Sequence, residues 1–223
     1  MSRKALIIVT SARTMGPGGK PTGFYWEELA TPYWRLVDAG FAVDIASVAG
    51  RKPPADPGSG DAENRPEAVQ RFMDNPAAME ALEQTVAIAN VRPEDYAVVF
   101  LPGGHGTMWD FAQTEAVGKT VARAYEAGAV VGAVCHGPAG LVEARLSDGS
   151  SLVAGKRVNS FTNAEEEAVG LTETVPFALE TRFRNLGARF EGNPENFQPY
   201  AARDGRLVTG QNPRSSDRVA TLL

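Results

Sequence analysis

The amino-acid sequence predicts an α/β fold in which a mostly parallel sheet carries helices on both faces. Short apolar, β-branched runs alternate along the chain with segments of helical spacing. The first strand, helix and second strand follow one another with short connections, an order that predicts parallel strands. A third observation is the run at 96–101, which is nearly all apolar, as expected for a strand covered on both faces.

The first half of the chain opens with this strand–helix–strand unit. Residues 4–10 predict a central strand, and residues 41–48 predict a second one. The helix between them covers 26–38, where Pro32 should kink or restart it and Gly40 should end it. Its apolar face consists of Leu29, Tyr33, Leu36 and Val37.

Residues 51–76 interrupt the alternation with five prolines and many charged side chains. A disordered linker is one interpretation of this composition. We favour an ordered insertion over the core, because Phe72 and Met73 give it apolar side chains to bury. Asp74 or Asn75 would then cap the helix that follows.

The second half of the chain continues the alternation. The helix after the insertion is expected over 76–90, and the strand at 96–101 follows it. Helical spacing resumes over 108–127 and closes at Gly128, before an apolar run at 129–134. The remaining elements are a hairpin or strand pair within 152–161, a helix across 165–168 or from 175 to 186, a short strand at 189–191, and a last strand at 206–213 that leads into a helix.

The composition limits the function classes. With 43% hydrophobic side chains, residues 1–223 are ample for a single domain. The net charge of −5 and the lack of a basic run argue against nucleic acid as a partner. No segment approaches the ~20 apolar residues of a membrane span, and the apolar start is too short for a signal peptide. One cysteine and two histidines exclude internal disulfides and a His-rich metal site, so we expect a reducing cytoplasm and no metal.

The cysteine lies at the turn that follows the run at 129–134. A turn between a buried strand and a helix holds its side chain out into a crevice, which is the elbow geometry of a hydrolase nucleophile. The start of the helix presents free N–H groups and a positive dipole end, and both favour the thiolate of Cys135. His136 is adjacent, and Gly137 and Gly140 leave room around the sulfur. The alternative is that Cys135 is a small buried hydrophobe, which is the commoner role of a free cysteine.

A second glycine turn follows the strand at 96–101. Gly103 and Gly104 allow backbone N–H groups to face inward without an intervening Cβ. The N–H groups of Gly104 and His136 would together form an oxyanion hole at Cys135. The turn lies at the carboxyl end of a strand, where open parallel sheets bind ligands, although most glycine pairs are plain turns.

Two acidic runs are candidates for the base that a cysteine nucleophile needs. Glu27 and Glu28 lie among aromatic side chains, and at most one can turn inward, where burial would raise its pKa. The run 165–167 is all glutamate, and one of its members could orient His136. The alternative for both runs is a solvated helix face.

Five blocks that span nearly the whole chain resemble one protein family. Residues 101–106 (Leu-Pro-Gly-Gly-His-Gly) and 133–138 (Ala-Val-Cys-His-Gly-Pro) resemble the ThiJ/PfpI superfamily, itself similar to class I glutamine amidotransferase domains. Residues 26–33, 160–166 and 209–213 narrow the resemblance to the branch of heat-shock chaperones with glyoxalase III activity. The resemblance implies a flavodoxin-like sandwich and a homodimer.

The resemblance also implies a catalytic role for each matching residue. Cys135 falls on the nucleophile and His136 on the adjacent catalytic histidine, while Gly104 falls on the glycine of the oxyanion hole. Ser160 stands where the branch often has glycine, and we expect no effect of this difference on the chemistry.

The catalytic acids follow from the resemblance in the same way. Glu28 falls on the buried glutamate that hydrogen-bonds the cysteine, whereas Glu27 does not. Glu166 falls on the acidic third member, and its neighbours Glu165 and Glu167 are the alternatives for that role.

The predicted function is that of a cofactor-free enzyme that acts on small α-oxoaldehydes, converting methylglyoxal to lactate as a glyoxalase III does. One alternative is a cysteine amidase or peptidase with the same Cys-His-Glu arrangement. Another is a protein that is not an enzyme, either a holding chaperone or a sensor in which Cys135 is oxidised.

Overall fold

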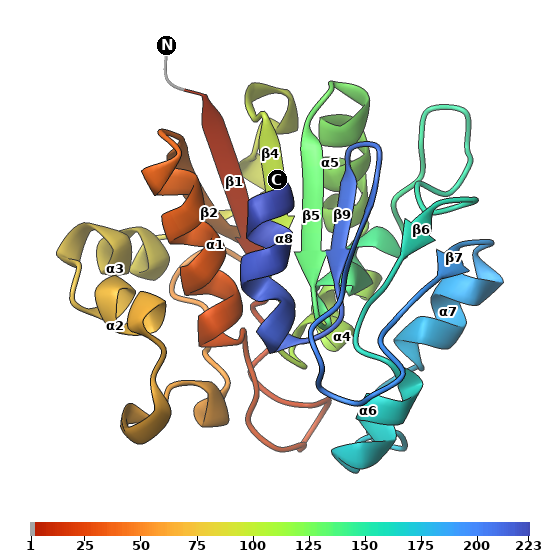
Figure 1. The fold of residues 1–223 in the computed structure, drawn as a ribbon. Helices are drawn as coiled ribbons and strands as arrows, with labels where there is room; N and C mark the ends of the chain where they lie inside the picture. The colour runs from red at the N-terminus through yellow and green to blue at the C-terminus, as the bar shows by residue number, and fades with distance from the viewer. Residues whose placement is uncertain (1–2) are drawn as a thin grey trace.

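The computed structural model describes residues 3–223, and a seven-stranded sheet forms its centre (Figure 1). The strand order is β3-β2-β1-β4-β5-β9-β8, and neighbouring strands are parallel except for β8 and β9. The strands are β1 (Lys4–Val9), β2 (Ala42–Ser47), β3 (Val86–Ala87), β4 (Val98–Leu101), β5 (Val130–Val134), β8 (Ala201–Asp204) and β9 (Leu207–Gly210). A separate parallel pair joins β6 (Arg157–Val158) to β7 (Arg189–Phe190). The predicted α/β fold with a mostly parallel sheet is confirmed.

Helices cover both faces of the sheet, as the alternation of side chains in β1 requires. Ala5, Ile7 and Val9 pack into one apolar cluster, and Leu6 and Ile8 into the other. The first cluster is closed by α1 (Trp26–Asp38), α2 (Glu67–Met73), α3 (Pro76–Glu83) and α8 (Ser216–Leu222), and the second by α4 (Thr107–Asp110) and α5 (Glu115–Glu126). Figure 1 shows α1 and α8 in front of the strands and α5 behind them. The face-to-face layering therefore follows directly from the period of two in the strand.

Two further helices and several 3₁₀ turns complete the chain. The helices α6 (Asn163–Ala168) and α7 (Leu179–Asn185) lie beside β6 and β7, beyond the edge of the main sheet (Figure 1). The 3₁₀ turns are Pro57–Ser59, Ala62–Asn64, Ile88–Asn90, Pro93–Asp95, Phe111–Gln113, Gly137–Leu141 and Pro213–Ser215. None of the helices in residues 3–223 is long and apolar enough to cross a membrane.

The order of the strands determines where a site can form. From β1 the chain builds outward to β2 and β3, and it then returns to add β4 and β5 on the other side of β1. Ligands bind open parallel sheets at such a switch point, outside the carboxyl ends of the strands. The glycine turn after β4 and the cysteine turn after β5 both lie at this edge.

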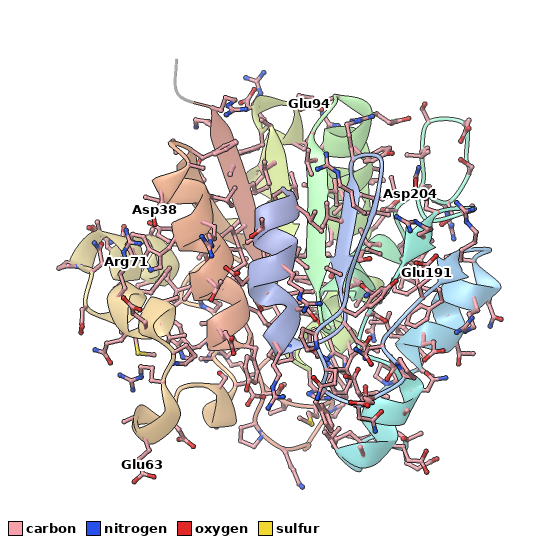
Figure 2. The ribbon with its side chains drawn as sticks, viewed as in Figure 1. Asp38, Glu63, Arg71, Glu94, Glu191 and Asp204 are labelled. Carbon is pink, nitrogen blue, oxygen red and sulfur yellow. The ribbon has the colours of Figure 1, made fainter. Side chains whose placement is uncertain are left out.

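The residues at 51–76 pack over α1. Phe72 of α2 is fully buried, as expected, and its ring contacts those of Trp26, Tyr33 and Trp34. Arg71 adds two hydrogen bonds of 2.8 Å to the carboxylate that ends α1 at Asp38, which Figure 2 shows between α1 and α2. These contacts give the segment a defined position on the core.

Two predictions for the first two thirds of the chain need correction, the extents of the helices expected over 76–90 and 108–127. Helix α1 is continuous through Pro32, so of the two effects expected of this residue the restart does not occur. Helix α3 begins at Pro76 with the expected cap, in which Asn75 accepts a hydrogen bond from the N–H of Ala78. It ends at Glu83 rather than at residue 90, because the chain then turns to pair Val86 with β2.

The expected helix over 108–127 is also divided. Phe111 enters the core and forms a 3₁₀ turn between α4 and α5. Asp110, just before it, is held by the N–H groups of Ser11 and Ala12 at 2.7 and 3.1 Å. The burial of Phe111 and the hydrogen bonds of Asp110 interrupt the helix, and α5 starts afterwards at Glu115.

The last third of the chain differs from the expectation in its strands. No hairpin forms within 152–161 in the described structure, because Arg157 and Val158 pair with a strand more than 30 residues later. Strand β8 was not predicted, since its alternation is short and includes the exposed Arg203. Both alternatives for the helix are present, as α6 and as α7.

Candidate active site

Cys135 occupies a strained turn directly after β5. Its φ angle is +59°, in the left-handed region that residues other than glycine seldom adopt. The backbone is fixed on both sides: the N–H of Cys135 donates to Gly210 at 2.9 Å, and its carbonyl accepts from Phe161 at 2.9 Å. The next turn needs Gly137, where a Cβ would lie 2.0 Å from the carbonyl oxygen of Leu101. The turn therefore presents the sulfur toward the carboxyl edge of the sheet, as the elbow prediction required.

His136 is the immediate partner of the thiol. Its Nδ1 lies 3.3 Å from Sγ of Cys135, and its Nε2 lies 2.8 Å from Oε2 of Glu166. The side chain is fully buried, and this burial lowers the pKa of His136 to about 4. Because the neutral ring donates Nε2–H to the carboxylate, its Nδ1 is left as an acceptor for the thiol proton.

Glu28 approaches the same thiol from the first turn of α1. It is completely buried, and its Oε2 accepts a hydrogen bond of 2.6 Å from the N–H of Gly103. Burial raises the pKa of Glu28 to about 8, against smaller lowering effects of Cys135 and Gly103. Its other oxygen, Oε1, is buried without a hydrogen-bond partner among the described residues. At neutral pH this group is therefore a neutral carboxylic acid with a proton to give.

The pKa of the thiol is the point at which the structure corrects the sequence prediction. Burial raises the pKa of Cys135, and the carboxyl group of Glu28 raises it further once it is ionised. The N–H groups of His136 and Gly104 act in the expected direction and lower it, but by less. The segment after the turn is a 3₁₀ helix of five residues, Gly137–Leu141, so it supplies little dipole to offset the burial. At neutral pH the side chain of Cys135 is therefore a thiol rather than the expected thiolate.

The two glycine positions after β4 are required by close packing. A Cβ on Gly103 would lie 2.7 Å from both Oε2 of Glu28 and the N–H nitrogen of His136. Gly104 has φ of +97°, and a Cβ there would meet the carbonyl oxygen of Gly23 at 2.2 Å. The turn can therefore approach the cysteine closely enough for the Gly104 N–H and the His136 N–H to reach the same sulfur.

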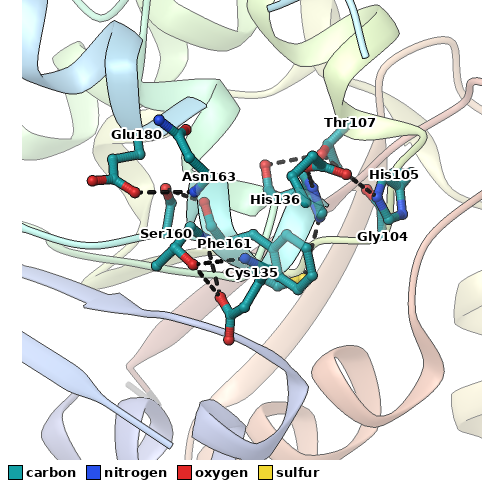
Figure 3. A network of polar contacts seen from close by, with 12 residues as sticks. Gly104, His105, Thr107, Cys135, His136, Ser160, Phe161, Asn163 and Glu180 are labelled. Atoms are coloured by element: carbon teal, nitrogen blue, oxygen red, sulfur yellow. Dashed lines mark hydrogen bonds and ion pairs between the residues drawn. The ribbon is translucent and has the colours of Figure 1, made fainter. Parts of the chain in front are cut away.

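Buried Thr107 joins the two turns. Its hydroxyl lies 2.9 Å from the carbonyl oxygens of both Gly104 and His136 (Figure 3). Each carbonyl belongs to a residue whose N–H faces Cys135. Thr107 thus holds the two backbone donors in register, a role that its sequence position gave no reason to assign.

The three glutamates at 165–167 lie in three different environments. Glu165 is fully buried and closes a capping box with Thr162, and it also accepts hydrogen bonds from the Phe197 N–H and from Asn212, each at 2.8 Å. Glu166 is the member that reaches His136, and Glu167 is exposed. The contact expected of one of these residues is therefore made by Glu166.

His105 is a site residue that sequence reasoning did not assign. Its Nε2 lies 2.9 Å from Oε1 of Glu166, so two histidines share one carboxylate. Figure 3 shows His105 beside Gly104 and facing His136, and the two ring centroids are 4.0 Å apart. The signal available in the sequence was the position of His105 directly after Gly104, the glycine expected in the oxyanion hole. Burial alone would raise the pKa of Glu166, but the hydrogen bonds from both rings lower it to about 2.

The same three side chains are the ones to consider for a metal ion. Donor atoms of His105, His136 and Glu166 lie within 4.8 Å of one another, the one such cluster in residues 3–223. Both Nε2 atoms already hydrogen-bond to the carboxylate. The two imidazoles therefore share one carboxylate through their Nε2 atoms.

A pocket of about 380 Å³ opens onto Sγ. Most of its wall is apolar, and no lysine or arginine lines it, which suits a small uncharged ligand. Burial raises the pKa of Tyr25 in the wall to about 12, so this phenol is neutral. The lining residues are Met15, Tyr25, Asp56, Gly104, His105, Cys135, His136, Phe161, Val169, Leu171, Phe197 and Pro213.

Comparisons with known proteins agree with one another. A model of the DJ-1/PfpI family matches residues 22–222. A probable glutathione-independent glyoxalase of Schizosaccharomyces pombe is 32% identical, over 96% of this chain and 95% of that protein. The X-ray structure of the Rapid Encystment Protein 24 kDa of Francisella tularensis matches with a TM-score of 0.93 at 32% identity, over 99% of this chain and 96% of that one. The crystal structure of glyoxalase III from Candida albicans matches with a TM-score of 0.90 at 28% identity, over 98% and 95%.

Proposed function

Because the chain belongs to the DJ-1/PfpI family, we propose that it is a cofactor-independent cysteine enzyme that converts small α-oxoaldehydes, such as methylglyoxal, to hydroxy acids. Relatives that match nearly the whole chain are named glutathione-independent glyoxalases or glyoxalase 3, and a similar structure is named glyoxalase III. The observation that carries the proposal is the convergence of an unprotonated ring nitrogen and a proton-bearing carboxyl group on the thiol of Cys135, which lines a small pocket.

The first step is addition of the thiol to the aldehyde. Sγ of Cys135 forms a bond to the aldehyde carbon while its proton passes to Nδ1 of His136, 3.3 Å away. The aldehyde oxygen becomes an oxyanion that accepts hydrogen bonds from the N–H groups of Gly104 and His136. The ring then returns the proton to this oxygen, and the product is a hemithioacetal. Because the thiol is deprotonated within the step, a raised thiol pKa is compatible with this chemistry.

The second step moves hydrogen between two carbons. A proton leaves the carbon bonded to sulfur and a proton arrives at the neighbouring carbon, while the hydroxyl proton of the hemithioacetal passes to the neighbouring carbonyl oxygen. The hemithioacetal thereby becomes the thioester of an α-hydroxy acid without net oxidation. His136 is neutral at pH 7 and can accept the first proton, whereas Glu28 is protonated and can donate the second. Glu166 holds the protonated His136 as an ion pair meanwhile.

The third step is hydrolysis of the thioester. Water adds to the thioester carbonyl, the carbon–sulfur bond breaks, and its electron pair returns to Sγ. The products are the hydroxy acid, which is lactate when the substrate is methylglyoxal, and the free thiol of Cys135, which takes the proton held by His136. Glu28 regains its proton from solvent. The apolar pocket without cations gives an anionic product no partner, which favours its release.

The proposed function is tested with purified protein and methylglyoxal, without added glutathione. We expect lactate to appear, as followed by proton NMR, and we expect Cys135→Ser to lose this activity. Lactate formation that requires added glutathione, or that persists in Cys135→Ser, would contradict the proposal.

A holding chaperone is the rival of a different class. Such a protein needs an apolar surface, and the exposed large apolar side chains of residues 3–223 are Val86 at 50% and Val169 at 42%. These lie on different elements, β3 and the end of α6, so they do not form a broad patch. Aldehyde turnover is therefore the better supported function.

The assembly and location of the protein are part of the proposal. We propose a homodimer in the cytoplasm, on the resemblance to the family and on the chain's single cysteine. Light scattering at micromolar concentration should give the mass of two chains. A mass of one chain would contradict the dimer without affecting the proposed chemistry.

A further inference from the structure

A carboxylate holds His105 in place, as is common for a catalytic base, but none of the three proposed steps uses this residue. Glu166 holds its Nε2 at 2.9 Å, and because that carboxylate is ionised, the nitrogen donates. In a neutral ring Nδ1 is then the acceptor, and the described hydrogen bonds give this atom no partner. The side chain is 17% exposed and lines the pocket, whereas His136 is fully buried.

The hydrolysis step needs a base that His136 is poorly placed to supply. Water reaches the pocket on its exposed side, where His105 lies, whereas His136 is fully buried and its Nδ1 lies 3.3 Å from Sγ. The same nitrogen is the nearest proton donor for Sγ as the carbon–sulfur bond breaks. A second base on the open side would allow the two proton transfers to proceed together.

The other pocket groups that titrate do not fit this role. Tyr25 is a neutral phenol, and Glu28 is buried and carries a proton at neutral pH. Both oxygens of Asp56 are engaged, Oδ1 by the N–H of Gly58 at 3.0 Å and Oδ2 by the hydroxyl of Thr22 at 3.3 Å. His105 is the group that combines an unpartnered acceptor with access to water.

We propose that His105 is the general base that activates water for hydrolysis of the Cys135 acyl-enzyme, an inference that rests on the thioester intermediate of the proposed function. Nδ1 of His105 takes one proton of the water as its oxygen bonds to the thioester carbon. The carbon–sulfur bond then breaks, its electron pair stays on Sγ, and Sγ takes a proton from His136. The acid product and the protonated His105 release their protons to solvent, so the step involves no oxidation or reduction.

The test uses an acyl-enzyme formed independently of methylglyoxal. p-Nitrophenyl acetate acylates a reactive thiol with a burst of p-nitrophenolate, and later turnover reports hydrolysis of the acyl-enzyme. In His105→Gln we expect a burst of wild-type rate and a steady state slower by about 10²–10⁴, the range for loss of a general base. The isolated acetyl-enzyme should be discharged at wild-type rate by hydroxylamine, a nucleophile that needs no base. All measurements contain EDTA, so that a bound metal ion is not the source of the effect.

Two matched variants complete the design. Cys135→Ala should show no burst, and Glu167→Gln, at an exposed position of α6 outside the pocket, should behave as wild type in both phases. The proposal is overturned if His105→Gln keeps the wild-type steady state, if it loses the burst as well, or if Glu167→Gln slows hydrolysis to the same extent. A protein that shows these phases but makes no lactate from methylglyoxal would contradict the proposed function and still support His105 as the base.

Discussion

Glu28 and Glu166 are two glutamates that flank the same thiol and have opposite pKa shifts. Each lies in the first turn of a helix, Glu28 in α1 and Glu166 in α6, and each is buried. The pKa of Glu28 is raised to about 8, whereas that of Glu166 is lowered to about 2. Neither the residue type nor the position in the helix explains this difference.

The partners of the two carboxyl groups explain it. Burial raises the pKa of both, because it removes water from the charged form. Glu28 receives one backbone N–H, from Gly103, and its second oxygen has no partner among the described residues. Glu166 receives a hydrogen bond from an imidazole on each oxygen, and these bonds outweigh its burial.

Glu28 and Glu166 show how one site obtains both an acid and an anion from two side chains of the same type. Where neighbouring environments separate the pKa values of two carboxyl groups, one can hold a proton and the other a charge at the same pH. Here Glu28 holds a proton beside the sulfur, and Glu166 is the anion that hydrogen-bonds both histidines. Each of these two assignments can be tested by its own substitution.

The largest effect is expected from Glu166→Gln. The amide removes the anion that selects the tautomer of His136 and that holds His105. Loss of the carboxylate behind a catalytic histidine costs about 10⁴ in turnover in comparable triads. Glu167→Gln, one residue away and exposed, should stay within a small factor of wild type in methylglyoxal turnover. Equal rates for the two variants would remove Glu166 from the mechanism.

A somewhat smaller effect is expected from Glu28→Gln. The substitution keeps the shape of the side chain but removes its proton, so turnover should fall by about 10²–10⁴. Glu27→Gln is the matched control, because successive helical residues point about 100° apart and Glu27 is directed away from the thiol. Thermal melts of both variants check folding. A greater loss in Glu27→Gln would show that the two residues have been assigned the wrong way round.

The smallest expected effect is on the pH dependence of the free energy of unfolding. The folded-state pKa of Glu28, about 8, lies above its ordinary value of 4.5, so the folded protein keeps a proton that the unfolded chain releases between these values. Its stabilising contribution is complete below pH 4.5 and is lost as the pH rises to about 8, with a slope of up to about 1.4 kcal/mol per pH unit. Glu166 acts in the opposite sense: its contribution is present above pH 4.5 and is lost as the pH falls to about 2.

Denaturant unfolding at a series of pH values measures both contributions. Glu28→Gln should flatten the decline of stability on the alkaline side, and Glu166→Gln should flatten the decline on the acid side. Glu167→Gln should follow wild type throughout. Parallel curves for Glu28→Gln and wild type between pH 4.5 and 8 would contradict the raised pKa of Glu28.

The sequence by itself determined which segments form the main strands and where the turn that carries Cys135 lies. Apolar runs with a period suited to strands, followed by glycine turns, are local patterns, and β1, β4, β5 and α1 form close to where they predict. The helix over 108–127 could not be delimited in this way, because its break depends on Asp110 binding the loop at Ser11 and Ala12, about 100 residues away.

Only the tertiary structure decided which side chains share the pocket and what state they are in. Glu28 meets Gly103 across 75 positions of the chain, and His105 meets Glu166 across 61. Burial and these distant contacts determine each pKa, so the raised thiol pKa of Cys135 and the part played by His105 could not be derived from neighbouring residues. A local pattern specifies the backbone conformation at a nucleophile, whereas its electrostatic environment is assembled from elements that the fold brings together.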